Sequence, residues 1–354
     1  MIARFAPEEG EALHRFQQEL FGPRARQLDE ARRRWLFVSN PLKVEPEASL
    51  WIATHEGEVV GQQAGISHRL KVGDLELNSS WSVDLMVRPE WRLRGIGPAL
   101  TDTYRRSYDL VMAVGATEAA YRAVIRSGWV GLGSLPTFVR PYRLNKILAW
   151  RGREGGLLGA AAHLATPGIK LLDTINSTYA FGSGTRLVEI PRFDARADAI
   201  WRTSSPDYPI AARRDLAFLG WRFDDSVDAG LYHRFYLMRG ETVLGYAVLR
   251  SGEQLGVEVG FVVDYLCPIA WSGPLFAWCV DWFRGREVEA LVADLNSPRA
   301  EPTLSRLGFW KGQRASGKRL LFSLGATCPA STELLNDPAA WFVTRADSDW
   351  DHPD

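Results

Sequence analysis

Hydrophobic and polar positions follow the same local pattern once in each half of the chain. In the first half, residues 51–66 (WIATHEGEVVGQQAGI) alternate around a glycine at position 57, with polar residues beside it. In the second half, residues 235–249 (FYLMRGETVLGYAVL) alternate in the same way around Gly240. Alternation on both sides of a glycine turn predicts a β-hairpin. The sequence therefore predicts one hairpin in each half.

Each hairpin is followed by the same predicted elements in the same order. A strand comes first, then a helix, a second strand, and a second helix that ends in a Gly-aromatic pair. The predicted elements are 77–87, 97–108, 110–115 and a helix ending at Gly128-Trp129 in the first half, and 257–266, 272–285, 288–295 and 297–308 with Gly308-Phe309 in the second. The two hairpin glycines, Gly57 and Gly240, lie 240 − 57 = 183 residues apart, and the glycines of the two Gly-aromatic pairs lie 308 − 128 = 180 residues apart. Two nearly equal offsets indicate a duplicated unit.

This pattern predicts an α/β protein, of α+β type with mixed sheets, built as two tandem domains. A chain of 354 residues is long enough for both. We expect the first domain at 1–144, a linker at 145–186, the second domain at 187–325 and a tail at 326–354. Proline cannot continue the hydrogen-bonding of a helix, so the linker is expected to hold a helix ended by Pro167.

Composition and charge exclude several classes of partner. The chain is 46% hydrophobic and 24% charged, which is ordinary for a globular protein with a core. Lys+Arg and Asp+Glu are balanced at 42 each, so we expect neither nucleic acid nor membrane as a partner. The three cysteines follow no metal-ligand spacing, and the N-terminus does not resemble a signal peptide. We therefore expect no metal site and a cytoplasmic location.

The turn between the first predicted strand and helix carries candidate chemistry. It reads VRPEWRLRGIGPAL from Val87, with glycines at 95 and 97 and arginines at 92 and 94. A strand-to-helix turn directs main-chain N–H groups and the positive end of the helix dipole towards one point. Glycines allow a bulky anion to approach, and guanidinium groups add charge-assisted hydrogen bonds. The turn therefore predicts a site for a phosphate-bearing cofactor.

Two common phosphate motifs do not fit this turn. A dinucleotide fingerprint would need a third glycine where Leu100 stands, and it would need a parallel βαβ unit rather than a preceding hairpin. A P-loop would need Gly-Lys followed by Ser or Thr, which this turn lacks.

The turn does resemble motif A of the GNAT superfamily of acetyl-CoA-dependent N-acyltransferases. The resemblance lies in Val87-Arg88-Pro89 followed by Arg92-Leu93-Arg94-Gly95-Ile96-Gly97. The Gly128-Trp129 end of the next helix resembles motif B, and the hairpin before the turn fits the same fold. The resemblance implies two tandem GNAT-like domains with a degenerate second copy, and transfer of an acyl group, most simply acetyl, from acetyl-CoA to an amine.

The resemblance also implies which residues hold the cosubstrate acetyl-CoA. In the family, main-chain groups of the turn bind the pyrophosphate, and those at the end of the preceding strand contact the pantetheine and the acyl carbonyl. A position at the start of the next helix also belongs to the motif. The matching residues here are Leu85, Met86, Val87, Arg92, Leu93, Arg94, Gly95, Ile96, Gly97 and Thr117.

Motif B departs from the family pattern at the position of its catalytic tyrosine. Where the family often has a tyrosine that protonates the leaving thiolate, this chain has Val124, so Tyr121 one turn earlier is the candidate acid. A general base must remove a proton from the attacking ammonium. Asp84 is the carboxylate on the strand before the turn and is the first candidate, and Glu118 is the second. Core packing is an alternative role for Tyr121, as is a satisfied or solvent-facing carboxylate for Asp84.

The second half departs further, since its matching segment LCPIAWSGPLFAW lacks Arg-x-x-Gly-x-Gly. We expect it not to bind CoA. Two rival functions stay open: a Fem-type aminoacyl transferase, and a non-catalytic CoA-binding or sensor protein. The expected acceptor is a small-molecule or sugar amine, and the sequence leaves the oligomeric state open.

Overall fold

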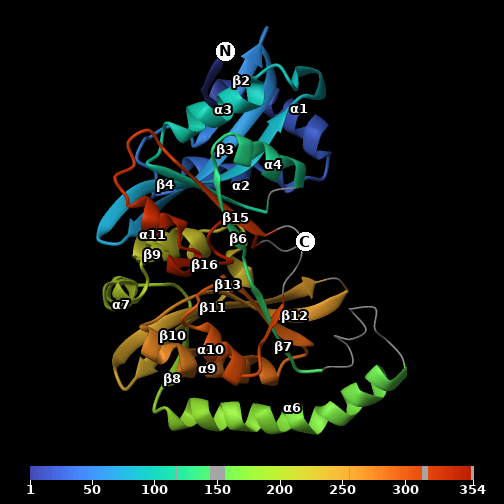
Figure 1. The fold of residues 1–354 in the computed structure, drawn as a ribbon, viewed down its shortest axis with the longest axis vertical. Helices are drawn as coiled ribbons and strands as arrows, with labels where there is room; N and C mark the ends of the chain where they lie inside the picture. The colour runs from blue at the N-terminus through green and yellow to red at the C-terminus, as the bar shows by residue number, and fades with distance from the viewer. Residues whose placement is uncertain (116–117, 144–155, 255, 313–317, 352–354) are drawn as a thin grey trace. The chain divides into compact units, whose positions relative to one another are not determined.

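The computed structural model describes residues 1–115, 118–143, 156–254, 256–312 and 318–351 (Figure 1). The chain forms two compact units. Unit 1 comprises Met1–Ser134, Asp225–Val227 and Ala315–Pro338, and unit 2 comprises Leu135–Asp224, Asp228–Arg314 and Ala339–Asp354. Each unit therefore combines segments that are far apart in the sequence, unlike the contiguous ranges expected from the repeat.

Unit 1 is a mixed sheet with helices packed on it. The sheet runs in the order β1-β2-β3-β4-β5-β15-β6, in which β4 and β5 are parallel and the other neighbours are antiparallel. Its elements are β1 (Ile2–Arg4), α1 (Gly10–Phe21), α2 (Glu30–Arg33), β2 (Leu50–His55), β3 (Glu58–Val72), β4 (Leu75–Val87), α3 (Ile96–Arg105), β5 (Leu110–Val114), α4 (Glu118–Arg126), β6 (Val130–Ser134), β15 (Arg319–Leu324) and α11 (Thr332–Asn336).

Unit 2 has a sheet of the same form. The order is β8-β10-β11-β12-β13-β7-β14, and here β12 and β13 are the parallel pair. Its elements are β7 (Thr137–Pro141), α6 (Gly156–Gly182), β8 (Arg186–Ile190), α7 (Arg196–Ser204), β9 (Ile210–Ala212), α8 (Leu216–Leu219), β10 (His233–Arg239), β11 (Thr242–Gln254), β12 (Val257–Leu266), α9 (Ser272–Arg284), β13 (Ala290–Asn296), α10 (Glu301–Arg306), β14 (Trp310–Gly312) and β16 (Trp341–Thr344).

The two sheets correspond strand by strand, with one exchange. The predicted order of hairpin, strand, helix, strand and helix is confirmed in both halves. However, the strand between β5 and β6 in unit 1 is β15, from the second half of the sequence. The equivalent strand between β13 and β14 in unit 2 is β7, from the first half. In Figure 1 this exchange appears as an orange-red strand in the sheet of unit 1, most of which is blue to green.

The helix in the linker was predicted to end at Pro167, and this prediction is wrong. Helix α6 extends from Gly156 to Gly182 and contains Pro167 in its interior. Polar contacts hold the part after the proline: Asp173 pairs with Arg140 of β7, and Ser177 Oγ donates to Asp281 Oδ1 of α9 at 2.5 Å. Because tertiary contacts fix this part, the missing N–H of the proline does not end the helix.

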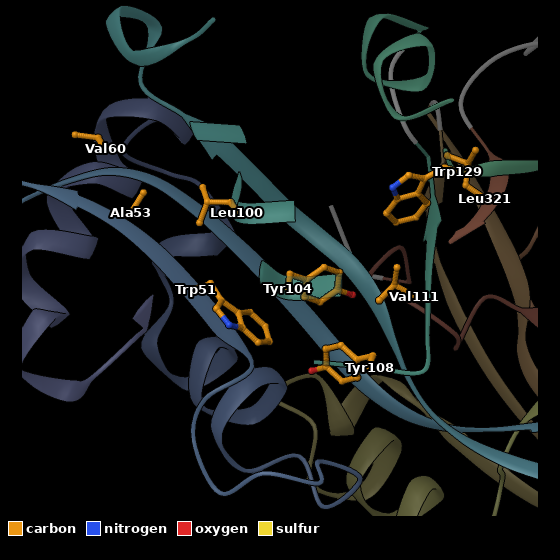
Figure 2. Packing of buried hydrophobic residues seen from close by; sticks show 9 residues of the cluster. All are labelled: Trp51, Ala53, Val60, Leu100, Tyr104, Tyr108, Val111, Trp129 and Leu321. Carbon is orange, nitrogen blue, oxygen red and sulfur yellow. The ribbon is translucent and has the colours of Figure 1, made fainter. Parts of the chain in front are cut away.

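Buried aromatic side chains in the core of unit 1 pack helix α3 against the sheet (Figure 2). Tyr104 of α3 packs edge-on against Trp51 of β2, with ring centroids 5.3 Å apart, and Tyr108 lies beside both rings. Gly65 of β3 makes room for this contact, since a Cβ there would lie 2.5 Å from the Tyr104 ring. The buried aromatic cluster thus sets where α3 lies on the sheet.

The last described residues are anchored in unit 2 by buried ion pairs. Asp351 is buried and accepts hydrogen bonds from Arg345 Nε at 2.7 Å and from Arg250 Nη2 at 2.8 Å. Burial disfavours the charged carboxylate, but the two guanidinium groups outweigh it and lower the pKa of Asp351 to about 2. The C-terminal segment is therefore held by a carboxylate that stays ionised.

This pairing predicts a pH-dependent effect of Asp351→Asn. The unfolded-state pKa of an aspartate is about 3.9, so the pairing contributes fully above that value and is lost as pH falls towards 2. We expect the variant to lose about 3–5 kcal/mol of unfolding free energy at pH 7, and the difference to shrink below pH 4. Urea unfolding across this range, with Glu253→Gln as an exposed control, measures it. A difference that stays constant with pH would contradict the assignment.

Candidate functional site

The turn before α3 leaves its main chain accessible. Gly95 is the N-cap of α3 and has φ = 83°, a left-handed conformation that favours glycine. A Cβ at Gly95 would have no heavy atom within 4 Å, and one at Gly97 would have only Val87 Cγ2, at 3.8 Å. Leu93 also has a positive φ of 60° and is fully exposed. The first turn of α3 therefore presents open N–H groups to an incoming anion.

The two arginines of the turn have different contacts. Arg92 Nε donates to the main-chain oxygen of Val87 at 3.1 Å, which ties the turn back to the end of β4. The guanidinium of Arg94 lies 5.0 Å from the ring centre of Trp91, in a cation–π contact. Both side chains are exposed. Arg92 therefore shapes the turn, while Arg94 adds positive charge beside it.

Close packing on β3 sets the position of this turn. A Cβ at Gly61 of β3 would lie 3.0 Å from Leu100 Cδ1 and 3.1 Å from Ile96 Cγ2. The glycine thus allows the start of α3 to approach the sheet closely. Ile96 of the predicted cofactor motif faces the sheet and packs against the core of unit 1. Its side chain is therefore structural.

Strand β4 is interrupted by a bulge just before the turn. Gln62 of β3 pairs with Met86 and Ala64 pairs with Val83, so two residues of β4, Asp84 and Leu85, face one residue of β3. Asp84 has φ = 52°, which is unusual for a residue other than glycine. A bulge takes main-chain groups out of the ladder and bends the strand. Leu85 is 40% exposed at this point.

Two buried glutamines hold the bulge in place. Gln62 Nε2 donates to the main-chain oxygen of Asp84 at 3.1 Å, and Gln63 Nε2 donates to that of Val83 at 3.1 Å. Both glutamines are almost fully buried in β3. Buried amide groups that each donate to a particular main-chain oxygen favour one local geometry, although Gln63 Oε1 has no hydrogen-bond partner among the described residues. Side-chain hydrogen bonds from β3 therefore stabilise the bulge in β4.

The parallel strands beside the bulge diverge. The pairing of β4 with β5 covers only Ser79 to Trp81 against Leu110 to Met112. The end of β4, including Leu85, Met86 and Val87, continues beyond this pairing with β3 as its partner strand. The β5 edge of this end of the strand is therefore the place where a ligand can meet the main chain.

Asp84 lies in a network of contacts from the helical N-terminal region. Its Oδ1 accepts from Gln27 Nε2 at 3.2 Å, and its Oδ2 lies 3.6 Å from Nη1 of the buried Arg32 of α2. A neighbouring guanidinium stabilises the charged form of a carboxylate. Asp84 is therefore an ion-paired carboxylate held in one position at the bulge.

The other two catalytic candidates are on α4. Glu118 is exposed and accepts from Arg319 Nη1 at 2.7 Å and from Arg122 Nε at 3.1 Å, and the hydrogen bonds from Arg319 and then Arg122 lower its pKa. Tyr121 packs against the core of unit 1, and the guanidinium of Arg319 lies 4.2 Å from its ring centre. Glu118 is therefore an ion-paired acid on the surface, and Tyr121 is a packing residue. Thr117 lies outside the described residues.

A hollow of about 680 Å³ lies beside α1 in unit 1. Glu11, His14 and Gln17 of α1 line it, as does Leu28. Gln17 Nε2 donates to Gln62 Oε1 at 3.1 Å, and Gln62 in turn holds the bulge. The wall of the hollow is thus two hydrogen bonds away from the main chain of Asp84.

Sequence reasoning missed the residues that build the bulge, namely Gln27, Arg32, Gln62 and Gln63. One signal was present, because Gln62 and Gln63 are adjacent polar residues inside an otherwise apolar strand pattern. Adjacent strand residues face opposite sides of a sheet, so two such glutamines point to a local irregularity. Nothing in the sequence marks Arg32 as the partner of Asp84.

Two further findings concern metals and membranes. Among the residues that the structure describes, no group of three or more His, Cys, Asp or Glu side chains is arranged to hold a metal ion. Within the same residues, every helix is too short or too polar to cross a bilayer.

Comparison with known proteins gives a fold-level result. No family model matches the chain, and no curated protein matches it. A GCN5-related N-acetyltransferase from Anabaena variabilis ATCC 29413 has a similar structure, with a TM-score of 0.62 and 11% identity over 92% of this chain and 72% of the other. A similar protein from Kribbella flavida, also a GCN5-related N-acetyltransferase, gives a TM-score of 0.59 and 14% identity over 92% and 71%.

A third solved structure is a conserved protein of unknown function from Enterococcus faecalis V583, described as a probable N-acyltransferase. Its TM-score is 0.61 and its identity 8%, over 92% of this chain and 72% of the other. At these identities the likeness establishes architecture. The chain thus has the mixed α/β fold of the GCN5-related N-acetyltransferases.

Proposed function

We propose that the chain is an acyl-CoA-dependent N-acyltransferase that moves an acetyl group from acetyl-CoA to an amine. The observation that carries this proposal is the open first turn of α3, with Gly95 in a left-handed conformation directly after a bulged β4. An anion-binding helix start and an irregular strand end lie next to each other in the chain. A long cosubstrate with a pyrophosphate at one end and a thioester at the other fits this pair of features.

In this proposal the protein acts mainly by positioning and by electrostatics. The N–H groups of Gly95 to Gly97 hold the pyrophosphate, with Arg94 adding charge. Main-chain groups from Leu85 to Val87 hold the pantetheine and donate to the acyl oxygen, where negative charge develops as the amine attacks. Fixing the thioester against the amine supplies much of the remaining rate gain.

We propose Asp84 as the group that attracts the ammonium form of the acceptor and takes its proton through a water molecule. Gln27 and Arg32 contact the carboxylate and orient it at the bulge. A thiol is a much stronger acid than an alcohol, with a pKa of about 8.5, so the thiolate of CoA is a good leaving group and departs without a strong proton donor. The reaction therefore does not require Tyr121 as an acid, in agreement with the packing of this side chain against the core of unit 1.

The proposed acceptor is a small-molecule or sugar amine. The hollow beside α1 falls within the range of pockets that bind small ligands. Its wall carries three glutamates and two arginines, namely Glu8, Glu11, Glu30, Arg15 and Arg33, and the excess of acid favours a cationic group. Gln17 links that wall to the bulge.

Thiol release from acetyl-CoA with a panel of amines tests the proposed activity. We expect release that depends on the added amine and is absent without it. A protein that binds acetyl-CoA but releases no thiol with any amine would instead be a CoA-binding or sensor protein. One observation favours that alternative, since Asp84 and Glu118 both have arginine partners.

Asp84→Asn tests the role of the carboxylate. If Asp84 is the base, the substitution lowers kcat by about 10²–10⁴-fold, and it removes the acidic limb of the pH–rate profile. Asn keeps an oxygen that can accept from Gln27, so the bulge should persist. Asp102→Asn on α3 serves as an exposed control. An unchanged kcat together with lower thermal stability would make Asp84 a purely structural residue.

A further inference from the structure

The diverging strands of unit 2 enclose another strand of the same chain. Strands β12 and β13 pair in parallel from Val259–Ala290 to Val262–Ala293, which corresponds to the short parallel pairing of β4 with β5. Beyond this point β13 pairs with β16 instead, through Leu295–Thr344 and Asn296–Val343. The opening at the end of the parallel pair is thus filled by a strand from the C-terminal segment.

Side-chain contacts attach β16 to both strands. Asn296 Nδ2 of β13 donates to the main-chain oxygen of Trp341 at 2.8 Å. Thr344 Oγ1 donates to Asp264 Oδ1 of β12 at 2.7 Å, and Phe342 packs edge-on against Tyr265 of β12 at 5.3 Å. All four residues of β16 are buried. It is therefore a packed part of the core.

The turn before α9 already has an anion bound to it from within the chain. The main-chain N–H of Ile269 donates to Asp207 Oδ2 at 2.7 Å. Pro268, the preceding residue, has no N–H to offer. At the matching turn of unit 1 the space around Gly95 is open. A carboxylate of the chain therefore binds the turn just before the helix start of α9, which matches the open helix start of unit 1.

Helix α6 covers the first turn of α9 and the end of α10. A Cβ at Gly273 of α9 would lie 2.5 Å from Tyr179 Oη, and one at Gly308 would lie 2.4 Å from Leu172 Cδ2. Asn176 Nδ2 donates to the main-chain oxygen of Leu307 at 3.0 Å. The hollow that remains between these helices measures about 300 Å³, at the lower limit for a small ligand.

We infer that the cofactor cleft of the second half is occupied by its own chain. β16 fills the opening between the strands, Asp207 binds the turn before α9, and α6 covers the start of that helix. Each chain consequently takes up one CoA, at unit 1, and unit 2 keeps the fold as a scaffold. The stoichiometry rests on the proposed function of unit 1, whereas the occupation of the second cleft does not.

Two measurements on the full chain test this inference together. Calorimetric titration with CoA should give one site per chain, and Gly97→Val should remove it. Amide hydrogen exchange without CoA should show slow exchange at Ile269 and across β16. Asp207→Ala should speed exchange at Ile269 by about tenfold or more, as expected when a hydrogen bond to a charged group is lost. Glu287→Ala, an exposed acid of unit 2, should leave it unchanged.

The outcomes separate the two proposals. One CoA per chain with slow exchange supports both. No CoA bound with slow exchange at Ile269 and β16 supports occupation of the second cleft and contradicts the proposed function. Two CoA per chain, or binding that survives Gly97→Val, overturns the inference. Fast hydrogen exchange across β16 in the parent protein also overturns the inference. That measurement is made on the parent protein alone, so it does not depend on whether a variant folds.

Discussion

Gly97→Val is expected to abolish CoA binding while leaving the fold intact. A β-branched side chain at this position projects from the first turn of α3, where the pyrophosphate must approach the main chain. The new Cβ would lie 3.8 Å from Val87 Cγ2, an ordinary contact, so the helix can accept it. In the parent protein, CoA at 100 times its Kd should stabilise the fold by about 2.7 kcal/mol. The variant should show no such stabilisation.

Controls make this result specific. NAD and ATP should give no stabilisation of the parent protein. Gly168→Val in α6 changes another helical glycine with open space around it, and it should keep the response to CoA. Gly95→Val should also abolish binding, but with an added loss of stability of about 1–2 kcal/mol, because Gly95 has φ = 83°. A full response to CoA in both loop variants would show that the turn is not the cofactor site.

Residues 1–144 expressed alone are expected not to fold. This fragment lacks β15, which lies between β5 and β6 in the sheet of unit 1. Leu320, Leu321 and Phe322 of β15 are buried, and Leu321 belongs to the core cluster shown in Figure 2. Losing one such side chain costs about 2–5 kcal/mol, and a whole domain is stable by only about 5–15 kcal/mol. The loss of all three, about 6–15 kcal/mol, is as large as the whole stability of a domain, and the hydrogen bonds of β15 to β5 and β6 are lost as well.

Co-expression supplies the control for this prediction. Residues 145–354 carry β15, so both fragments together can rebuild the sheet of unit 1. Thermal unfolding followed by circular dichroism should show a cooperative transition for the mixture and none for 1–144 alone. A cooperative transition of the single fragment at the melting temperature of the full chain would mean that β15 is dispensable.

The order of elements was predictable from sequence because its signals are local. Alternation around Gly57 and Gly240 indicates hairpins within a few residues, and helical periodicity with a closing Gly-aromatic pair indicates the helices. The open turn at Gly95 and Gly97 was also predictable, because a glycine-rich start of a helix is a property of consecutive residues. These features are confirmed.

The features that only the tertiary structure decided depend on residues far apart in the chain. Strands β7 and β15 carry no local signal for which sheet each will join, since strand pairing depends on packing against neighbours. Asp84 was chosen as a candidate from its place on β4, but its partner Arg32 and its positive φ arise from the folded bulge. Occupation of the second cleft by β16, Asp207 and α6 is likewise non-local.

Pro167 illustrates the same division. By local rules a proline ends a helix, and the prediction followed that rule. Contacts of Asp173 and Ser177 with distant elements instead hold α6 helical beyond it. The sequence by itself determined the repeated elements and the open turn, because neighbouring residues encode both. The exchanged strands, the bulge at Asp84 and the occupied second cleft required the tertiary structure, because their stability comes from contacts between segments that the sequence keeps apart.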